Sequence, residues 1–294
     1  MSYSYREVKT PTTYSEQISL LQSRGCIIDD EAIAKCFLKR VNYYRFSGYF
    51  HVFKQKDGSF FNDVTFDTLA SAYSFDQELR ALLIKVVSEI ELTAKSIIAY
   101  HHSHLYGATG YQDANNFSEK HNHSKFMKQL DSVIKSNYTT PFVKHHFNVY
   151  GGKLPLWVAT ELFTMGMVSL FYADLKITDK KDIAKEYDTD YVHLESWLHS
   201  TSVLRNICAH YARTYPTAFR QPPKLTKVYA KNKSIGVYSL GRQLCMLKLL
   251  CTNSKADWNN AFVLPLTALM EKYENTINLD LMGLPSDWEK VLSW

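Results

Sequence analysis

Three residues that can act on RNA stand close together in the second half of the chain: Arg205, Asn206 and His210. A neutral imidazole can take the proton from a ribose 2′-hydroxyl, and an imidazolium can protonate the leaving oxygen. A guanidinium can hold the scissile phosphate through two hydrogen bonds and offset charge in the transition state. The set therefore predicts RNA cleavage without a metal ion, with the asparagine amide orienting the imidazole.

The spacing of these residues limits what one chain can do. At about 100° per residue on a helix, Arg205 and His210 lie roughly 140° apart, whereas Asn206 and His210 are one turn apart and can touch. One helix thus supplies half of a site, and a second copy related by a two-fold axis would complete it. An ion-paired arginine and a hydrogen-bonded histidine on a solvated face would give the same short pattern, so the spacing alone does not decide.

The sequence lacks the motifs of several other common enzyme classes. It contains no GxxxxGK[ST], no GxGxxG after a strand, no HExxH and no GxSxG. Five of the histidines that precede the motif are grouped at positions 101, 102, 104, 121 and 123, without a carboxylate or cysteine at ligand spacing. We therefore expect no metal and no cofactor. We expect these histidines on the surface, near a helix end or in an exposed loop over residues 109–124.

The composition is that of a folded and mildly basic protein. The 294 residues are 46% hydrophobic and 21% charged, with a formal net charge of +5, which permits attraction to phosphates without demonstrating it. The five cysteines form no CxxC pair, which suits a reducing compartment. The first residues are polar, and no run of about 18 apolar residues occurs, so we expect a cytoplasmic protein without a membrane span.

Apolar periodicity predicts helices along most of the chain and few strands, so the fold class is all-α. Two helices matter most: one over roughly 67–105 with a continuous apolar stripe, and one over 190–213 that carries the motif. The other ranges expected to be helical are 13–50 (as short helices), 125–136, 156–175, 179–187, 238–252 and 256–274. Helix caps are expected at Thr13 with Glu16, and at Asp29 or Asp30.

Proline marks the expected division of the chain. Pro216 and the pair at 222–223 follow the motif helix, and proline disfavours helix in the residue before it. We therefore expect one domain over residues 1–219 and a C-terminal helical region over 220–294 that packs on the first.

Several ordered segments of the sequence resemble one known family. They are LLQSRGCII (20–28), NYYRFSGY (42–49), YSFDQELR (73–80), IE (90–91), LPLWV (154–158), RNICAH (205–210) and MGLPSDW (282–288). Together they resemble the Abi-like proteins of bacterial abortive infection, which belong to the wider HEPN superfamily. The resemblance covers most of the chain.

The resemblance implies a HEPN-like helical bundle with additional helices at both termini. It also implies a homodimer in which the R-x4-H pairs, here Arg205 and His210, form a composite metal-independent endoribonuclease site. The products would carry 2′,3′-cyclic phosphate ends. The biological role implied is phage defence or an RNase toxin, restrained by a structured noncoding RNA or a protein antitoxin.

The sequence departs from the family pattern beside the motif. Family members often continue with a basic residue and then Trp-Asn, whereas this chain has Tyr211, Ala212 and Arg213. HEPN toxins that are silenced by nucleotide transfer carry a tyrosine where Ala212 stands, which puts that mode of silencing in doubt. The family often has an arginine at the position of Lys95.

Other residues are weaker candidates for contact with RNA. Tyr43, Tyr44 and Arg45 would form a stacking surface, although core packing of the rings explains them equally well. Lys95 and Arg213 complete this set. Glu89 or Glu91, on the neighbouring helix, is expected to form an ion pair with Arg205.

Three functions therefore stand side by side at this point. The first is a dimeric endoribonuclease in which each protomer supplies Arg205, Asn206 and His210. The second is a HEPN-fold protein that binds a structured noncoding RNA and cleaves nothing. The third is a helical scaffold for other proteins. RNA affinity that survives His210→Ala would indicate the binder, and no RNA affinity at all would indicate the scaffold.

Overall fold

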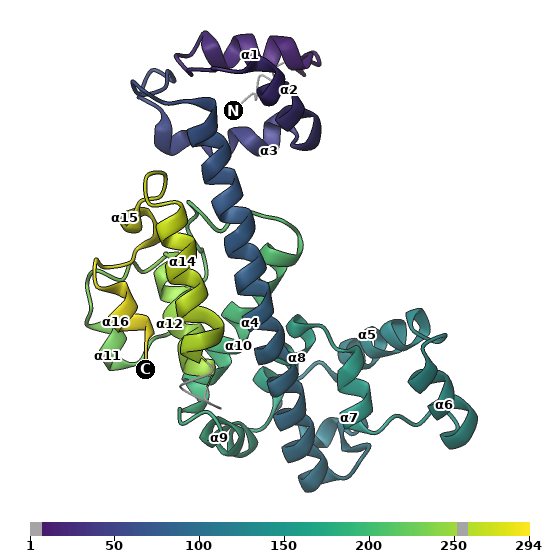
Figure 1. Cartoon of the computed structure of the whole chain (residues 1–294). Helices are drawn as coiled ribbons and strands as arrows, with labels where there is room; N and C mark the ends of the chain where they lie inside the picture. The colour runs from purple at the N-terminus through teal and green to yellow at the C-terminus, as the bar shows by residue number, and fades with distance from the viewer. Residues whose placement is uncertain (1–7, 252–257) are drawn as a thin grey trace, which may run out of the picture. The chain divides into compact units, whose positions relative to one another are not determined.

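The computed structural model describes residues 8–251 and 258–294, and within these ranges the chain folds into helices joined by turns (Figure 1). Extended pairing among the described residues is limited to three isolated β-bridges. The all-α fold class is confirmed.

The described chain separates into two compact units. The first contains the residues up to Gln77 together with Glu271–Ile277, and the second contains Glu78–Met270 and Asn278–Trp294. Residues on both sides of position 219 belong to the second unit. A separate C-terminal region from residue 220 stays a prediction.

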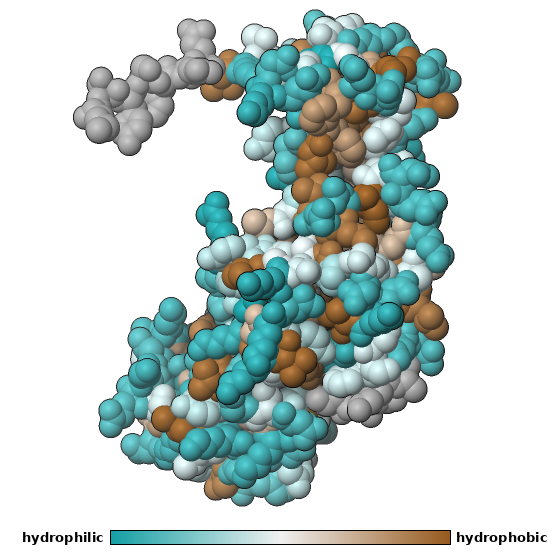
Figure 2. Space-filling model, turned by 90° about the vertical axis from the view of Figure 1, so that its left-hand side faces the viewer, coloured by the Kyte–Doolittle hydropathy of each residue, from teal (hydrophilic) through white to brown (hydrophobic). Residues whose placement is uncertain are grey.

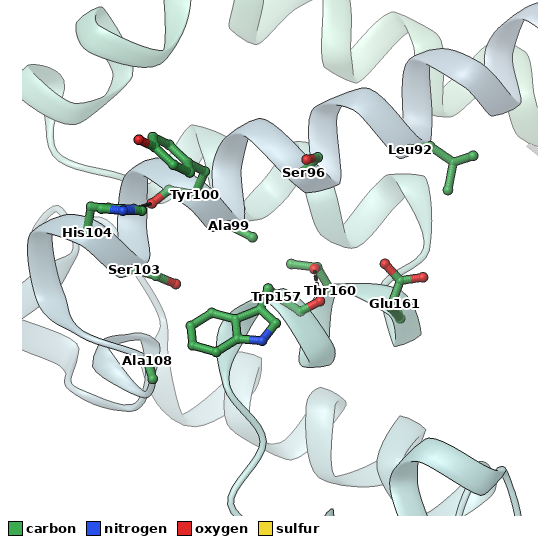
Figure 3. A pocket seen from close by; sticks show the side chains of 10 residues that line it. All are labelled: Leu92, Ser96, Ala99, Tyr100, Ser103, His104, Ala108, Trp157, Thr160 and Glu161. Carbon is green, nitrogen blue, oxygen red and sulfur yellow. Dashed lines mark hydrogen bonds between the residues drawn. The ribbon is translucent and has the colours of Figure 1, made fainter.

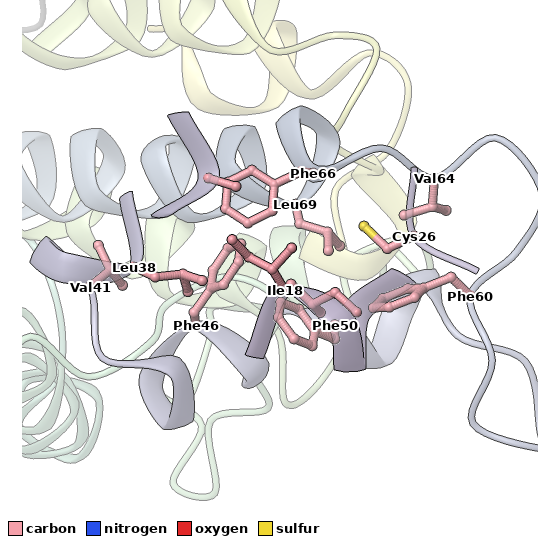
Figure 4. Close-up of a cluster of buried hydrophobic side chains, with 12 residues drawn as sticks. Ile18, Cys26, Leu38, Val41, Phe46, Phe50, Phe60, Val64, Phe66 and Leu69 are labelled. Carbon is pink, nitrogen blue, oxygen red and sulfur yellow. The ribbon is translucent and has the colours of Figure 1, made fainter. Parts of the chain in front are cut away.

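The first unit is built from short helices around an aromatic core. Its helices are α1 (Tyr14–Gln22), α2 (Glu31–Arg40), α3 (Tyr43–Ser47) and the 3-10 turn η1 (Phe50–Phe53). The predicted caps are confirmed: Thr13 and Glu16 form a capping box, and the Asp30 side chain accepts hydrogen bonds at the start of α2. Phe46 lies at the centre, 4.8 Å from Phe50 and 5.5 Å from Phe66 between ring centroids (Figure 4).

One long helix, α4 (Phe66–Tyr106), begins in the first unit and continues into the second. Its predicted apolar stripe is buried, as at Leu79, Leu83, Val86 and Ile90. Burial of such a stripe at the 3.6-residue period stabilises a helix far more than propensity does.

The centre of the second unit is α10 (Tyr191–Ala209), the helix of the motif. It packs against α8 (Met165–Asp174), α9 (Ile177–Lys185) and α12 (Leu240–Leu250). Trp197 on α10 is buried, and its indole Nε1 donates to the carbonyl oxygen of Lys224 at 2.6 Å. A well-packed central helix gives the motif a rigid base.

Most of the remaining predicted helices are present with shifted ends. The helices are α5 (His123–Ser136), α6 (Pro141–Tyr150), α7 (Leu156–Ala159), α11 (Lys227–Ala230), η5 (Asn259–Val263), α14 (Leu264–Lys272), α15 (Leu279–Met282) and α16 (Trp288–Leu292). The sequence analysis did not predict α6, α11, α15 or α16. Residue 252 of the helix predicted over 238–252 and residues 256–257 of the one predicted over 256–274 lie outside the described residues.

Two predictions about helix extent are wrong. The helix predicted over 156–175 is split into α7, the 3-10 turn η4 (Thr160–Leu162) and α8. The break occurs because Phe163 is extended and the Thr164 hydroxyl accepts from the backbone N–H of Met167, which starts a new helix. The helix predicted over 190–213 ends at Ala209.

The segment 109–124 is not the exposed loop that its polarity predicts. It forms the 3-10 turns η2 (Gly110–Gln112) and η3 (Ala114–Asn116), and Tyr111 and Phe117 are buried. The Tyr111 hydroxyl donates to the Leu154 carbonyl at 2.7 Å. Two aromatic anchors therefore hold the polar segment against the protein.

None of the helices in the described ranges combines the length and the apolar character that a membrane span requires. On the face drawn in Figure 2, hydrophilic residues predominate and hydrophobic ones form small separate groups.

Candidate active site at the end of helix α10

The end of α10 is closed by a backbone motif that puts His210 at the C-cap, directly after the last helical residue, Ala209. The N–H of Ala212 bonds to the Ile207 carbonyl at 2.9 Å, and the N–H of Tyr211 bonds to the Cys208 carbonyl at 3.2 Å. Tyr211 has a φ of 56°, the left-handed conformation that this motif requires. Glycine usually occupies that position. Because tyrosine stands here, the end of the helix could not be predicted from the residue type.

A buried arginine on α4 supports the turn after His210. Arg80 is buried, and its Nη1 lies 3.5 Å from the carbonyl oxygen of Ala212, a long hydrogen bond. The sequence reading did not assign Arg80 a role. This role could have been predicted from the sequence, because Arg80 is a charged residue inside the apolar stripe of α4 and a buried charge needs a partner.

Arg205 faces α4 and is held by an acidic residue there. Its Nε lies 3.6 Å from Oε2 of Glu91, and the other Glu91 oxygen lies 3.0 Å from Nζ of Lys95. The predicted ion pair is confirmed for Glu91. The Arg205 side chain keeps 34% of its surface exposed, whereas Glu91 and Lys95 keep much less. Arg205 is therefore oriented from within the chain but still open on one side.

Asn206 and His210 are exposed. Among residues 8–251 and 258–294, neither side chain forms a hydrogen bond, and the expected contact between the amide and the imidazole is not formed. The imidazole of His210 is thus free to exchange protons with a ligand. Arg205 points to α4 while His210 lies in solvent, so one protomer presents the two groups separately, as the helical spacing predicts.

The histidines near position 121 are held inside the protein, which corrects the prediction of a surface location. His121 Nδ1 lies 2.8 Å from Asp174 Oδ2, and its ring stacks on Phe117 at 4.0 Å between centroids. His123 Nε2 donates to the carbonyl oxygen of Gln112 at 2.8 Å. Only 2% of the His121 side chain is exposed. These rings fasten the 109–124 segment to α8.

His102 is also buried, again contrary to the prediction of a surface histidine. It packs among Tyr106, Phe117 and Phe171, and neither ring nitrogen has a hydrogen-bond partner among the described residues. Burial lowers the pKa of His102 to about 4, so the ring is neutral at pH 7.

Unlike His102, the other two histidines of this helix have hydrogen-bond partners. His101 Nε2 lies 2.9 Å from Glu186 Oε1, and His104 Nδ1 donates to the Tyr100 carbonyl at 2.8 Å. His101 is half-buried and only His104 is exposed, so the predicted surface location holds for His104. Within the described ranges, no group of three or more histidine, cysteine, aspartate or glutamate side chains is arranged to hold a metal ion.

The weaker RNA-contact candidates separate into buried and exposed residues. Tyr43 packs against Phe50 and burial raises the pKa of its hydroxyl, whereas Tyr44 is 88% exposed and Arg45 is also exposed. These three residues belong to the first unit. In the second unit, Lys95 is buried beside Glu91, and Arg213 is half-buried.

A separate cavity of about 580 Å³ opens between α4 and α7. Figure 3 shows Trp157 and Glu161 facing the α4 side chains Leu92, Ser96 and Tyr100. Motif residues do not line it. The cavity is therefore not the place where Arg205 and His210 would act.

Comparison with known proteins gives one result. A family model described as an Abi-like protein matches residues 36–216, which is more than half of the chain and includes the motif. No curated protein and no solved structure matches the chain.

Proposed function

The chain belongs to the Abi-like protein family, and on this basis we propose that it is a cytoplasmic endoribonuclease of the HEPN type. Membership in the family supports a role in phage resistance by abortive infection. The observation that carries the nuclease proposal is the end of α10, where His210 is exposed and unpaired among the described residues while Arg205 is oriented by Glu91.

The proposed reaction needs one proton acceptor, one proton donor and positive charge. A neutral His210 takes the proton from the ribose 2′-hydroxyl, whose oxygen then attacks the adjacent phosphorus. The bond from phosphorus to the 5′ oxygen breaks, and a protonated imidazole supplies the proton to that oxygen. The products are a 2′,3′-cyclic phosphate and a free 5′-hydroxyl, and Arg205 holds the phosphate oxygens throughout.

The proposal requires two copies of the chain, because one protomer presents Arg205 and His210 on different sides of α10. A two-fold axis near the end of α10 would bring two arginines and two histidines together. Exposed apolar side chains beside the site support such an interface: Leu92 follows Glu91, and Tyr211, 67% exposed, follows His210. Asn206 would orient an imidazole or a phosphate within that interface.

Such an activity would harm the cell that makes it, so we propose a restraining partner. A structured noncoding RNA or a protein antitoxin that covers the end of α10 would silence the site. Phage infection would then release it.

The proposal is tested by induced expression in bacteria. Wild type is compared with Arg205→Ala and His210→Ala, and growth and total RNA are followed. His145→Ala is the matched control, because His145 is exposed on α6 and outside the motif. We expect wild type and His145→Ala to arrest growth and fragment RNA, and the two motif variants to do neither while remaining folded and dimeric.

A harmless wild type is retested under phage infection, which supplies the trigger. If the motif variants then protect as well as wild type, the nuclease proposal is wrong. RNA affinity that survives His210→Ala without any cleavage would favour the alternative, a HEPN-fold protein that binds a structured noncoding RNA. Absence of RNA affinity would leave only a protein-binding role.

A further inference from the structure

The positive charge of this chain is concentrated in one segment. Residues 196–256 contain ten Lys or Arg and no Asp or Glu, whereas the other 233 residues hold 24 Lys or Arg and all 29 Asp and Glu. The segment thus carries a formal charge of +10 and the rest of the chain −5. Such segregation is typical of a surface that meets a polyanion.

The segment folds back along the motif helix. After the turn at the end of α10, residues 221–224 run antiparallel to it. The Lys224 N–H donates to Ser196 Oγ at 2.9 Å, and Ser200 Oγ donates to the Gln221 carbonyl at 3.4 Å. The Gln221 side chain also bonds to His199. Residues 213–224 are here called the basic strap, and its last four residues run along one side of α10.

Two cations of the basic strap, Arg220 and Lys224, are open to ligands. Arg220 and Lys224 are exposed, and neither forms an ion pair with any residue in the described ranges. Elsewhere in the acid-free segment, Arg242 and Lys248 are used internally: they donate to the carbonyl oxygens of Pro223 and Val291. The strap thus keeps two of the segment's positive charges available beside α10.

A groove of about 950 Å³ begins where the basic strap ends. Lys224 lines it together with Lys120 and His199. Its floor is apolar, with Leu170 and Ile177 exposed to solvent.

Further polar groups line the groove, among them one serine hydroxyl and two carboxylates. The Ser118 hydroxyl oxygen lies in the groove wall, buried and without a hydrogen-bond partner among the described residues. Of the two carboxylates, Glu195 is paired with Lys180 at 2.8 Å, and Glu119 is exposed beside Lys120. The groove combines phosphate-binding cations with surfaces on which bases can pack.

The groove, Asn206 and His210 lie on the same side of α10. Positions seven residues apart on a helix differ by only about 20° and by about 10 Å along the axis. Val192 and His199 line the groove, Asn206 is seven residues further, and His210 follows one turn later. All four are exposed, so these positions on this side of the helix are accessible to a ligand.

We propose that single-stranded RNA lies along this path, from the groove past the basic strap to Asn206 and His210. Lys120, Arg220 and Lys224 bind its phosphates, and the apolar floor holds unstacked bases. The bases of a duplex could not pack on that floor, because they are already stacked on one another. The inference rests on the proposed function only in naming RNA as the ligand, and its test measures binding without cleavage.

The experiment measures binding of a labelled single-stranded RNA of roughly 12 nucleotides by fluorescence anisotropy. His210→Ala serves as the parent in every arm, so the RNA stays intact. One variant adds Lys120→Ala, Arg220→Ala and Lys224→Ala. The matched control adds Lys125→Ala, Lys128→Ala and Lys135→Ala, which removes the same charge from the exposed face of α5. Thermal unfolding checks that all three proteins are folded.

We expect the groove variant to bind at least about tenfold more weakly than the parent, and the control to match the parent. Each lost phosphate contact lowers the salt slope for a single strand by about 0.7, so the slope should fall by about 2. Equal losses in the two triple variants, or no loss in either, would overturn the proposed path. A parent that binds no RNA would overturn it too, whereas cleavage by the wild type is decided separately.

Discussion

Two groups of histidines in the second unit, His121 with His123 and His210, have the same chemistry in opposite surroundings. His121 and His123 are tied to Asp174 and to the Gln112 carbonyl, and the His121 ring is stacked on Phe117. The His210 side chain lies in solvent after the end of α10, without a hydrogen bond to any described residue. A ring with both nitrogens engaged contributes to structure, whereas an unengaged ring can accept or donate a proton in a reaction.

The contrast teaches that clustering in the sequence is a poor guide to a working histidine. The five histidines at positions 101–123 are the denser group, yet four of them are buried or bonded to remote parts of the chain. The lone histidine at 210, by contrast, is exposed, and its side chain has no hydrogen bond to the described residues. Removing one histidine at a time tests this comparison directly.

The largest effect is expected for His210→Ala. Loss of a general acid–base group costs about a hundredfold to ten-thousandfold in rate, so RNA cleavage should fall by at least a hundredfold. The melting temperature should stay within experimental error of wild type, because the side chain has no partner to lose among the described residues. Cleavage by the purified protein and a thermal melt measure the two quantities. A clear drop in melting temperature would place His210 with the structural histidines.

The next effect concerns His102 and the dependence of stability on pH. Its pKa is about 4 in the folded protein because burial disfavours the charged ring, while the unfolded chain titrates near 6.5. The unfolded state therefore binds the proton first. The stability contributed by the neutral His102 ring is fully present above pH 6.5. It is lost as the pH falls towards 4, and the free energy of unfolding decreases by about 3 kcal/mol.

His102→Leu should remove this part of the pH dependence while keeping the ring's space filled. Denaturant unfolding of both proteins from pH 7 to pH 4 measures the difference. If the wild type and the variant lose stability in parallel, burial of His102 is not the cause.

A smaller loss of stability is expected for His121→Ala. The substitution leaves the Asp174 carboxylate without its partner and removes the ring that stacks on Phe117. An unsatisfied polar group costs about 1–3 kcal/mol, so we expect a destabilisation of about 2 kcal/mol with normal cleavage wherever the protein is folded. Loss of cleavage without loss of stability would reverse the two histidine roles.

The smallest effect is expected for Glu91→Gln, which weakens the attachment of Arg205 without removing the guanidinium. We expect about a tenfold loss of kcat with little change in KM, because a misplaced guanidinium stabilises the transition state less. Lys95→Gln is the control, since it breaks the other ion pair of Glu91 but leaves the one to Arg205. Equal effects of the two substitutions would mean that Glu91 acts only on stability.

The helix starts and the buried stripe of α4 could be predicted from residues that lie close together in the sequence. Thr13 with Glu16 and Asp30 start helices as expected, and the apolar stripe of α4 is buried along its length. These signals are readable because caps and stripes depend on residues within one or two turns. The ion pair of Arg205 with Glu91 was expected as well, although it joins two helices.

Two other features, the end of α10 and the break before α8, could not be predicted from the sequence, and the reason is physical. The end of α10 depends on a tyrosine in a left-handed conformation, which residues other than glycine and asparagine seldom adopt. The break before α8 depends on one threonine hydroxyl inside an apolar run. In both cases a single backbone contact overrides a continuous periodic pattern.

By itself, the sequence of this chain determined the helical class, the family and the three residues of the motif, because periodicity and short motifs are local in the chain. Only the tertiary structure decided which histidine is available. The partner of His121 is 53 residues away and that of His101 is 85 residues away, and hydrogen bonds over such separations exist only once the chain has packed.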